Sequence, residues 1–562
     1  MDTATKPMYE WETINWGKIQ RSVYKLQKRI YRAAQRGDDR TVHRLQRLLT
    51  HSRYAKLMAV RRVSQDNQGK NTPGVDGVAR LRRQQKVKLA NKLALNDKSQ
   101  PTKRVWIPKP GKDEKRPLGI PTMEERAKQA LLKMGLEPEW EAKFEPNSYG
   151  FRPGRSAHDA IAAIYNGIVQ KAKYVLDADI EKCFDRINHK KLLDKLGTTP
   201  TFRKQIRAWL KSGVMDGNVL FPTEEGTPQG GVISPLLANI ALHGIEEMLK
   251  SKFFRRVENG RKRNVTCVRY ADDFVLMDES LEVVLEAKKV VEEWLGEIGL
   301  KLKEAKTQIT HTLIEHEGKV GFNFLGFHIR QYPCSDKQSG SIGGTERKRG
   351  HKTLIKPSKE SISRNLDKID DILRRNGASG QEQVINALNP IIRGWAAYYS
   401  TVASAVIFNS MDSIMYQKLR GWANKRSKRG CNKTDMVSKY WGVNRGKGWR
   451  FMTPDNKYTL EKYQNTKIRR HVKVKEDRSP YDGDLTYWSK RLSNHPILRN
   501  VVSLLIRRQG GKCSQCNLMF TSEDILEVHH IDTNRGNNKH TNLKLVHRHC
   551  HDVIHANSTQ TS

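Results

Sequence analysis

Two adjacent carboxylates, Asp272 and Asp273, interrupt the apolar stretch RYADDFVL at residues 269–276. Acidic side chains are almost never fully buried unless a partner neutralises them. The pair could form a solvated hairpin turn, which is a common place for Asp. Two carboxylates in one small site repel each other, however, and the pKa of one rises unless a cation lies between them. The pair therefore favours a metal site, provided that a third carboxylate joins it.

Asp179 is the candidate third carboxylate, in the segment KYVLDADIEKCFDRI at residues 173–187. Its apolar neighbours predict a buried strand that contains Asp177 and Asp179. An isolated acid in a strand is usually a surface residue, but three acids together form a site for hard cations such as Mg²⁺, which prefer oxygen ligands. Two such ions, about 3.5–4 Å apart, stabilise the attacking and leaving oxygens of an in-line phosphoryl displacement. The acids thus predict phosphoryl-transfer chemistry.

A second set of metal-ligand residue types lies near the C-terminus. Cys513 and Cys516 form one pair, and His547 and Cys550 form another pair with the same spacing. One pair alone could be a turn with free thiols. Two pairs far apart in the sequence fit one tetrahedral structural Zn²⁺. The segment is too short to bury a large core, so a metal would also explain how it folds.

The charge of the chain indicates the class of its partner. Among 562 residues there are 102 Lys and Arg but 60 Asp and Glu, a formal net charge of +42. Such an excess favours nucleic acid as the partner, with a basic membrane-surface protein as the rival. No apolar run approaches the ~18 residues of a membrane span, and the first residues show no signal-peptide core. We therefore expect a soluble, internal protein of several domains without membrane association.

The elements that must position these residues alternate along the chain. Residues 17–62 predict amphipathic helices rich in Arg, which are either ordinary surface helices or an RNA-binding surface. Residues 100–345 alternate short strands and helices, and residues 336–352 are a Gly-rich loop or linker. Residues 355–425 predict helices. The chain is therefore expected to be multidomain α/β.

A second basic region, from Lys418 to Arg450, has eleven Lys or Arg and one acid. A charge run is usually a solvated face. Four aromatic residues lie among these cations, and aromatics interleaved with cations favour base stacking and phosphate contact. They are Trp422, Tyr440, Trp441 and Trp449.

Seven motifs follow one another in an order that is similar to that of a known family. They are RPLGIPTMEERAKQALL (116–132), NSYGFRPGRSAHDAI (147–161), DIEKCFDRI (179–187), GTPQGGVISPLLANI (226–240), YADD (270–273), GLKLKEAKTQITH (299–311) and FLGF (324–327). The chain resembles, over essentially its whole length, a reverse transcriptase of the group II intron-encoded type. The resemblance implies a right-hand polymerase fold with fingers, palm and α-helical thumb.

The resemblance also implies roles for single residues of the polymerase site. Asp179, Asp272 and Asp273 would hold two Mg²⁺ ions. Phe184 would lie under the incoming sugar and exclude a ribose 2′-OH, although it could also be a plain core ring. Four further positions are implied in nucleotide binding: Lys109 and Arg116 grip the triphosphate, Gln229 packs against the templating pair with Gly230 and Gly231, and Lys306 protonates the pyrophosphate leaving group.

The segment INALNPIIRGWAAYYS (385–400) resembles the thumb of this family, called domain X or the maturase domain. Ile391, Trp395 and Tyr398 fall on one helix face, which predicts packing on a neighbouring element. The maturase role comes from the resemblance alone: such proteins bind their own intron RNA and help it to splice.

The C-terminal segments EVHHID (527–532), TNL (541–543) and HDVIH (551–555) resemble the HNH endonuclease pattern, which implies a small ββα-metal domain stapled by zinc. His530 would be the general base that activates water. His529, His551 and His555 would hold one divalent ion on the scissile phosphate, and Asn542 would orient the base or complete the metal shell. One departure is His547, which stands where many relatives have Cys.

Together these features predict an RNA-directed DNA polymerase with maturase and site-specific DNA endonuclease activity, acting in intron mobility by target-primed reverse transcription. The rivals are a non-catalytic splicing factor and a retron-like or diversity-generating reverse transcriptase. The expected domains are an N-terminal helical extension (1–99), fingers and palm (100–345), thumb (346–465), a DNA-binding segment (466–505) and the nuclease (506–562). The expected partners are the intron RNA, target DNA and dNTPs. For the oligomeric state, the sequence leaves both a monomer and a homodimer open. The expected location is the bacterial cytoplasm, with an organelle as the alternative.

Overall fold

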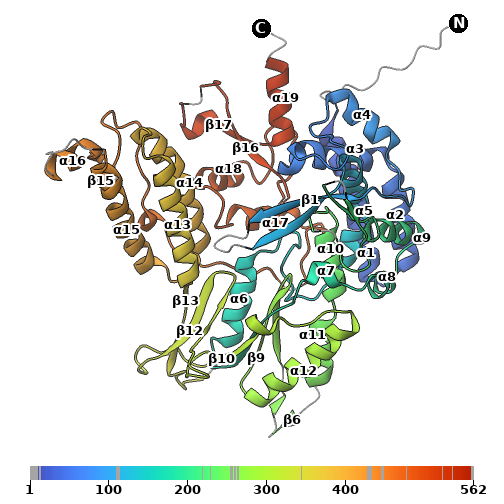
Figure 1. Ribbon diagram of the computed structural model, residues 1–562, viewed down its shortest axis with the longest axis horizontal. Helices are drawn as coiled ribbons and strands as arrows, with labels where there is room; N and C mark the ends of the chain where they lie inside the picture. The colour runs from blue at the N-terminus through green and yellow to red at the C-terminus, as the bar shows by residue number, and fades with distance from the viewer. Residues whose placement is uncertain are drawn as a thin grey trace.

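The computed structural model describes residues 11, 14–108, 114–217, 219–227, 229–253, 257–258, 261–262, 265–343, 345–426, 433–444, 448–475, 477–521, 523–534 and 536–558. The chain is mixed α/β with several packed regions, as expected. Figure 1 shows the N-terminal helices and the helices α13–α15 on opposite sides of the molecule, with the strands between and below them. Among the described helices, none combines the length and the apolar composition that crossing a bilayer requires.

The N-terminal region is helical, as the amphipathic pattern predicted. The side chain of Asn15 accepts a hydrogen bond from the backbone N–H of Lys18, 2.9 Å away, and so caps the first helix. Ile19, Val23 and Ile30 are buried and share a core with the long buried helix α5. The helices are α1 (Trp16–Gln35), α2 (Asp39–His51), α3 (Arg53–Arg61), the π-helical turn η1 (Arg62–Asp66), η2 (Gln68–Asn71), α4 (Arg83–Lys92) and α5 (Met123–Glu141).

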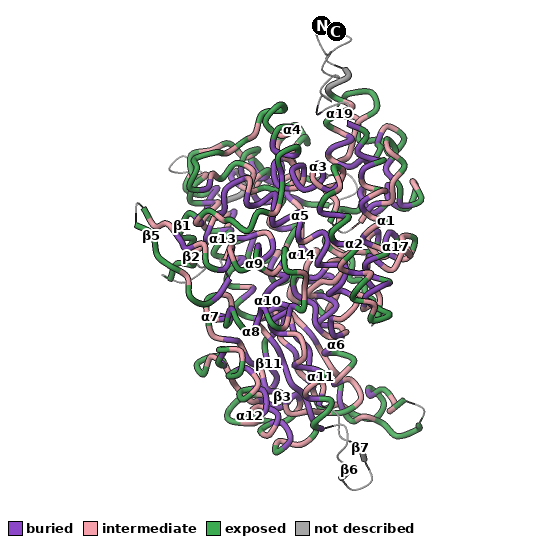
Figure 2. Tube along the Cα trace, turned by 90° about the vertical axis from the view of Figure 1, so that its right-hand side faces the viewer, coloured by how far each residue is buried: buried purple, intermediate pink, exposed green. Residues whose placement is uncertain are grey.

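A first sheet, of order β2-β1-β4-β5, follows these helices along the chain. Its strands β1 and β2 are antiparallel, and their register pairs Ile107 with Arg116. Much of this sheet is exposed, and Figure 2 shows β5 at the outside of the molecule. Its strands are β1 (Thr102–Pro108), β2 (Lys115–Ile120), β4 (Val214–Asp216) and β5 (Val219–Phe221).

The central sheet, of order β10-β3-β9-β8, is antiparallel throughout. In β9, Phe274 and Leu276 pack into one core cluster, and Val275 and Met277 pack into another. Successive side chains point to opposite faces of a strand, so this sheet separates the two cores. The predicted strands on both sides of the acidic pair are confirmed. The bounds are β3 (Tyr174–Asp179), β8 (Thr266–Tyr270), β9 (Asp273–Asp278) and β10 (Gln308–His311).

Seven helices surround the central sheet. Helix α6 contacts β8, and α12 contacts β3 and β9. The seven helices are α6 (Ala157–Ile168), α7 (Cys183–Arg186), α8 (His189–Leu196), α9 (Pro200–Leu210), α10 (Ser234–Leu242), α11 (Ile245–Phe253) and α12 (Leu281–Glu297). A short hairpin, β6 (Val257–Glu258) and β7 (Arg261–Lys262), follows α11. The turn η3 (Glu304–Lys306) precedes β10.

The region after the central sheet is helical from residue 359, close to the predicted start. A three-stranded sheet, β11 (Phe322–Phe324), β12 (Phe327–Pro333) and β13 (His351–Pro357), leads into it. The helices and the hairpin that follow are α13 (Lys359–Arg375), α14 (Gln381–Tyr399), α15 (Ala405–Asn424), α16 (Lys433–Tyr440), β14 (Trp441–Asn444) and β15 (Gly448–Phe451), followed by η4 (Tyr463–Asn465).

The predicted packing face of α14 is confirmed for two of its three residues. Trp395 packs on Phe408 of α15, with ring centroids 5.9 Å apart, and Tyr398 packs on Phe327 of β12 at 5.2 Å. The fully buried stripe of the helix lies beside this face and runs through Leu388, Ile392, Ala396 and Tyr399.

The aromatic residues predicted to stack on nucleic acid are mostly core residues. Trp422, Tyr440 and Trp441 are at most 7% exposed and belong to the core that α13, α14 and α15 share. Trp449 is 42% exposed, and its ring stacks on that of Trp441 with centroids 5.9 Å apart. Only Trp449, among these four, keeps a surface that a base could contact.

The segment expected to bind DNA, residues 466–505, packs against the rest of the chain. Val474 and Trp488 are buried in the core that residues of α6 share, and Tyr481 donates a hydrogen bond of 2.8 Å to Glu137 of α5. Asp159 of α6, fully buried, accepts hydrogen bonds from His471 at 3.0 Å and from the backbone of Val474 at 2.8 Å. This segment is thus fixed to the polymerase region by a buried carboxylate.

The chain ends in a compact C-terminal unit, residues 500–558, preceded by α17 (Leu485–Ser493). It contains α18 (Asn500–Arg508), β16 (Leu526–His530), η5 (His540–Asn542), β17 (Leu543–His547) and α19 (Arg548–Ser558). β16 and β17 are antiparallel, and Leu526 pairs with His547. Two strands followed by a helix is the order that the sequence predicted here.

Candidate active site and metal centres

The three predicted polymerase acids meet at the turn between β8 and β9. The register of β3 and β9 pairs Asp179 with Asp273, and the backbone N–H of Ile180 donates to the carbonyl of Asp272 at 3.3 Å. Antiparallel partners of this kind have Cβ atoms about 4.5–5.5 Å apart. Backbone pairing therefore brings Asp179, Asp272 and Asp273, the carboxylate triad, to one place.

Neighbouring residues hold the turn that carries the triad in place. Ala271 has a φ of 58°, which is rare for a residue with a side chain. The buried guanidinium of Arg269 donates to the carbonyl of Ala271 at 3.1 Å. A Cβ on Gly150 would lie 2.3 Å from the backbone nitrogen of Ala271, so the loop at 147–150 can approach the turn only with glycine there.

The electrostatics of the triad favour a bound cation. Burial, with the charges of Asp272 and Asp179, raises the pKa of Asp273 to about 7. Burial also raises the pKa of Asp272, against the opposing charges of Lys306 and Arg116. Buried oxygen ligands that repel one another are the donor set that Mg²⁺ favours. The residues present therefore fit the divalent ions predicted from the sequence.

Lys306 lies against the triad, in the short turn η3. Its ammonium group makes an ion pair with the carboxylate of Asp179. Partial burial opposes the charge of Lys306, but the hydrogen bond to Asp179 and the charges of Asp273 and Asp272 raise its pKa. Lys306 thus carries a proton beside the reacting groups, as its predicted role requires.

Asp177 is a neighbour of the triad to which the sequence assigned no role. It lies two residues before Asp179 on β3, so both side chains share a face of the strand. Burial raises its pKa to about 6. The alternation of strand side chains is the signal that could have identified it.

The loop with Gln229 lies between the first sheet and α7. The backbone N–H of Gly119 on β2 donates to the carbonyl of Gln229 at 2.6 Å, and the side-chain amide of Gln229 is 3.4 Å from both carboxylate oxygens of Asp185. Gly230 has a φ of +111°, and a Cβ there would lie 2.7 Å from the carbonyl oxygen of Gly119. Glycine therefore allows this loop to pack on β2.

Phe184 is half-buried in α7, four residues after Ile180. Its ring packs on the first core and meets the half-exposed ring of Phe151 edge to face, with centroids 6.2 Å apart. The ring is therefore held from two sides. Arg116 is exposed on β2, and Lys109 lies outside the described residues.

The four residues of the metal site predicted near the C-terminus also lie close together. One ligand atom from each of Cys513, Cys516, His547 and Cys550, the zinc-ligand set, lies within 4.8 Å of the others. All are buried except Cys516, which is partly exposed. The Nδ1 atom of His547 is 3.4 Å from the sulfur of Cys516, and the neighbouring thiols lower the pKa of Cys513. Three sulfurs and one nitrogen at this spacing fit tetrahedral Zn²⁺.

Three histidines form a separate group, the histidine cluster: His529 of β16 with His551 and His555 of α19. Their ligand atoms also lie within 4.8 Å of one another, and the Nε2 atoms of His551 and His555 are 3.2 Å apart. Burial, with the neighbouring histidines, lowers the pKa of His529, which keeps its ring nitrogen available to a metal. Glu527, which the sequence did not single out, contacts Nδ1 of His551 at 2.9 Å.

His530 and Asn542 lie next to this cluster. Neighbouring side chains in a strand point to opposite faces, so His530 faces away from His529. Its Nε2 atom is 3.3 Å from Oδ1 of Asn538. The amide of Asn542 bonds to Asp532, accepting at 3.0 Å and donating at 2.7 Å, and so fixes the loop that carries Asn538.

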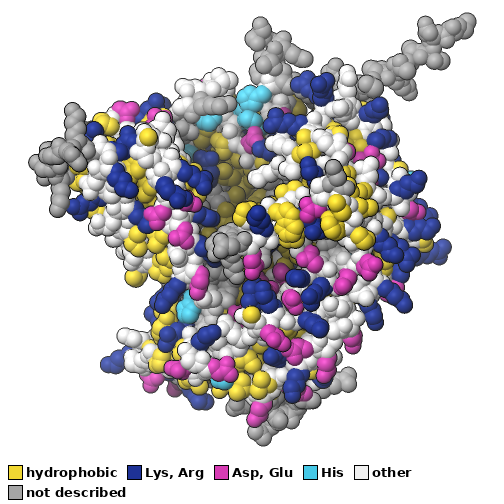
Figure 3. Space-filling view, in the orientation of Figure 1, with side chains coloured by type: hydrophobic (Ala, Val, Ile, Leu, Met, Phe, Trp, Pro, Cys, Tyr) yellow, Lys and Arg dark blue, Asp and Glu magenta, His cyan; other side chains and the backbone are white. Residues whose placement is uncertain are grey.

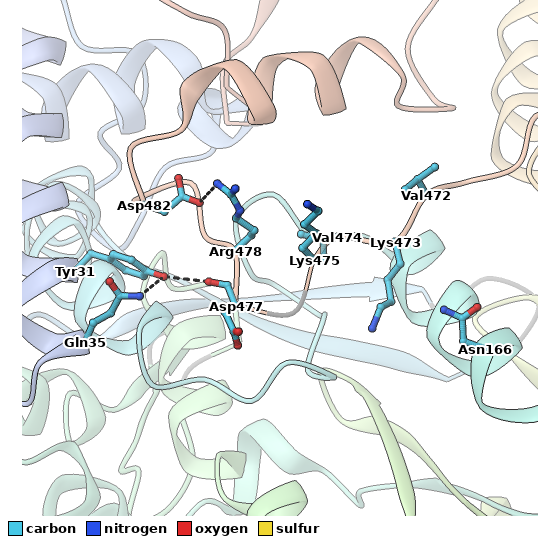
Figure 4. A pocket seen from close by; sticks show the side chains of 10 residues that line it. All are labelled: Tyr31, Gln35, Asn166, Val472, Lys473, Val474, Lys475, Asp477, Arg478 and Asp482. Carbon is cyan, nitrogen blue, oxygen red and sulfur yellow. Dashed lines mark hydrogen bonds and ion pairs between the residues drawn. The ribbon is translucent and has the colours of Figure 1, made fainter.

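An open groove of about 780 Å³ lies along the segment 472–482, next to α1 and α6. Figure 4 shows Lys473, Lys475 and Arg478 along one wall, with Asp477 and Asp482 beside them. Arg478 forms an ion pair with Asp482 at 3.2 Å, so the charges of this wall are partly balanced. Its lining residues are distinct from the carboxylate triad, the zinc-ligand set and the histidine cluster.

Three family models match the chain. The model for reverse transcriptase (RNA-dependent DNA polymerase) matches residues 107–329, and the model for the N-terminal domain of reverse transcriptase matches residues 11–93. The model for the maturase-specific domain of group II introns matches residues 362–441. The matched ranges contain the carboxylate triad, most of α13, and the whole of α14 and α15.

Proteins of similar sequence agree with these models. Protein YkfC of Escherichia coli is 32% identical, in an alignment 328 positions long that covers 51% of this chain and 83% of that protein. The group II intron-encoded protein LtrA of Lactococcus lactis is 28% identical, in an alignment 532 positions long that covers 79% of this chain and 81% of LtrA. Maturase-like protein 1 of Euglena gracilis is 26% identical, in an alignment 403 positions long that covers 69% of this chain and 77% of that protein. The chain therefore belongs to the reverse transcriptase family and carries, after its polymerase region, the maturase-specific domain of group II introns.

Proposed function

We propose that this protein copies its group II intron RNA into DNA and that its own C-terminal unit nicks the target DNA to provide the primer. The observation that carries this proposal is the presence of two separate metal-competent centres on one chain. The carboxylate triad lies in the central sheet, and the histidine cluster lies in a ββα unit beside the zinc-ligand set. A splicing factor without catalysis would need neither.

In the polymerase site, the carboxylate triad would hold two Mg²⁺ ions, which supply charge neutralisation for the attacking 3′ oxygen and the pyrophosphate. Arg116, with Lys109, would bind the triphosphate. The ring of Phe184 would contact the sugar and exclude a 2′-OH. The ammonium of Lys306 would give its proton to the leaving pyrophosphate, and its ion pair with Asp179 keeps it charged until then.

In the C-terminal unit, the histidine cluster would hold one divalent ion that neutralises the scissile phosphate. His530 would take a proton from water, whose oxygen then bonds to phosphorus. The bond from phosphorus to the 3′ oxygen breaks, and that oxygen takes up a proton to become a 3′-OH. Glu527 would fix the ring of His551 through their 2.9 Å contact. The product of this site is the group that the polymerase extends.

The surfaces for nucleic acid follow from charge. Helix α1 and its C-cap residue Arg36 present six exposed cations at helical spacing on one face, and these would bind phosphates of the intron RNA. They are Lys18, Arg21, Lys25, Arg29, Arg32 and Arg36. Figure 3 shows Lys and Arg side chains over much of the visible surface, with histidines at the rim of a hollow whose floor is apolar. The groove along 472–482 would contribute to binding of target DNA.

The test uses two variants of the full-length protein. Asp272→Asn with Asp273→Asn should abolish cDNA synthesis on a primed RNA template but keep RNA binding and DNA nicking. His530→Ala should abolish nicking but keep cDNA synthesis from an added primer. The matched control is Asp371→Asn, which alters an exposed carboxylate of α13 and should change neither activity. cDNA synthesis by the double variant would refute the polymerase assignment, and nicking by His530→Ala would refute the nuclease assignment.

A further inference from the structure

His547 is the unusual member of the zinc-ligand set, because it is a ring among three thiols. An imidazole has two nitrogens, and a ring that binds a metal through one of them needs a partner at the other to keep its orientation. The side chain of His547 is 2% exposed. Its ring lies edge to face with Phe520, with centroids 4.9 Å apart, and stacks on His549 at 5.1 Å. The two ring nitrogens are therefore the atoms through which the His547 side chain makes polar contacts.

The two nitrogens of His547 face different groups. Nδ1 faces the sulfur of Cys516 at 3.4 Å, on the side of the metal ligands. Nε2 faces a carboxylate oxygen of Asp524 at 3.4 Å, a charge contact that is longer than an aligned hydrogen bond. The arrangement is that of a carboxylate behind a metal-binding histidine.

Asp524 is itself held in place. Its side chain is 10% exposed, and its Oδ2 atom accepts hydrogen bonds from the backbone N–H of Thr521 at 2.7 Å and from the Thr521 hydroxyl at 2.9 Å. Its Oδ1 atom accepts a hydrogen bond of 3.5 Å from the amide of Gln20, on α1. One carboxylate therefore contacts both the zinc-ligand set and the first helix of the chain.

The first turn of helix α1 also lies near the zinc-ligand set. A Cβ added to Gly17 would lie 3.5 Å from the Cβ of Cys516, which is ordinary van der Waals distance. Next to it, Arg62 of η1 forms an ion pair with Glu523 at 2.8 Å. A cavity of about 330 Å³ remains in this interface, and Gln20, Arg62 and Asp524 are among its lining residues. The C-terminal unit is thus docked on α1 and η1 through the loop that contains Asp524.

We propose that Asp524 is a positioning residue that orients His547 toward the zinc ion and couples zinc binding to the docking of the C-terminal unit on α1. This inference rests on the proposed zinc site but not on the proposed nuclease activity. Zinc-bound His547 would fix Asp524, and Asp524 would then offer its second oxygen to Gln20. Without zinc, Asp524 keeps its contacts with Thr521 and Gln20 but loses a fixed partner at His547.

The test measures zinc affinity of the full-length protein by competition with a chromophoric chelator, and zinc content by elemental analysis. Asp524→Asn keeps the size of the side chain but removes its charge, and it should weaken zinc binding roughly 10- to 100-fold. Glu523→Gln is the matched control, because it removes a neighbouring charge that contacts Arg62 and not His547. Its zinc affinity should equal that of the unaltered protein.

A double-variant cycle separates orientation from a general effect on folding. His547→Cys replaces the ring with a thiolate, which needs no carboxylate behind it. If Asp524 acts through His547, Asp524→Asn should cause no further loss of zinc in the His547→Cys protein. An equal loss in both backgrounds would overturn the proposal, as would normal zinc affinity in Asp524→Asn. Unaltered protein that contains no zinc would overturn the zinc site itself together with this role.

The docking part has its own readout, hydrogen exchange measured by mass spectrometry. Removal of zinc with a chelator should raise amide exchange in α1 and η1, but not in α12, which lies against the central sheet. Glu523→Gln should raise exchange in η1 while zinc stays bound. Unchanged exchange in α1 and η1 after zinc removal would overturn the coupling. None of these measurements uses nicking, so they stay interpretable even if the nuclease assignment fails.

Discussion

The carboxylate triad shows how single residues with like charges are brought together by the backbone. The pairing of β3 with β9 places Asp179 opposite Asp273, and the adjacent turn adds Asp272. The repulsion is visible in the pKa of Asp273, which burial and its neighbours raise to about 7. Folding of the sheet therefore prepares a site whose charge is completed by a cation.

Phe184 is the residue at which sugar discrimination can be tested. Phe184→Val shortens the ring that Phe151 supports, so a 2′-OH should fit, and ribonucleotide incorporation relative to deoxynucleotide incorporation should rise roughly tenfold or more. Primer extension with each nucleotide type measures this ratio. Phe221→Val, at an exposed ring of β5, is the matched control and should leave the ratio unchanged. An unchanged ratio in Phe184→Val would place the discrimination elsewhere.

Glu145 is expected to make stability depend on pH. Burial opposes its ionisation, but the contact with His243 at 3.7 Å, the charge of Arg269 and the hydrogen bond from the N–H of Glu246 lower its pKa from 4.5 to about 2. A lowered folded pKa gives stability that is present above pH 4.5 and is lost as the pH falls toward 2. The contribution at neutral pH is about 3 kcal/mol, because one pKa unit corresponds to about 1.4 kcal/mol.

Glu145→Gln should therefore lower the free energy of unfolding at pH 7. At pH 3 the free energies of unfolding of the variant and the unaltered protein should differ by less than at pH 7. Denaturant unfolding at both values measures this. The control is Asp194→Asn, which alters an exposed ion pair with Arg203. If the gap between Glu145→Gln and the unaltered protein were the same at both pH values, the carboxylate charge would not be the cause.

At the scale of elements, local patterns were predicted well and long-range packing was not. The strands around Asp179 and the acidic pair were predicted because apolar alternation and turn residues are properties of short segments. The burial of Trp422 and Tyr440 was missed, because their rings meet each other and Phe451 across separate elements, with centroids of Trp422 and Tyr440 5.5 Å apart. The role of Asp524 was missed for the same reason, since Gln20 lies far away in the sequence.

The segment 466–505 allows a test of element packing. A chain that ends at Asn494 keeps Val474, Tyr481 and Trp488 in place and loses only the C-terminal unit. It should extend a supplied primer and unfold near the temperature of the full chain. A chain that ends at Thr466 loses all three buried side chains, each worth roughly 1.5–3 kcal/mol, and should unfold at a markedly lower temperature. Thermal unfolding and primer extension compare the two, and equal behaviour would contradict the packing described here.

At the scale of the whole molecule, the net charge of +42 is large, and part of it is concentrated on one helix face. The six cations of α1 and its C-cap form one exposed face, while the apolar face of the same helix packs on α5. A surface of this kind binds phosphates and releases counterions. Binding of intron RNA should therefore weaken steeply as the salt concentration rises.

Replacing Arg21, Lys25 and Arg29 with Gln should make the log–log dependence of RNA affinity on salt shallower by about 2–3, because each phosphate contact contributes about 0.7–0.9. Filter binding at several KCl concentrations measures the slope. The control replaces Lys190, Lys191 and Lys204, which are exposed on α8 and α9, with Gln. An equal change of slope in both proteins would mean that α1 is not a specific RNA surface.

The contacts of α1 with the end of the chain set an order for synthesis on the ribosome. Tyr24 and Tyr31 donate to the carbonyls of Pro480 and Asp477, and Gln20 reaches Asp524. At roughly 5–20 residues per second, the helix emerges between about twenty seconds and a minute and a half before these partners. During that interval its cationic face is already exposed, so the nascent chain can engage RNA before the C-terminal unit exists. A chain that ends early at a premature stop codon would lack Asp477, Pro480 and Asp524, so these contacts of α1 would never form.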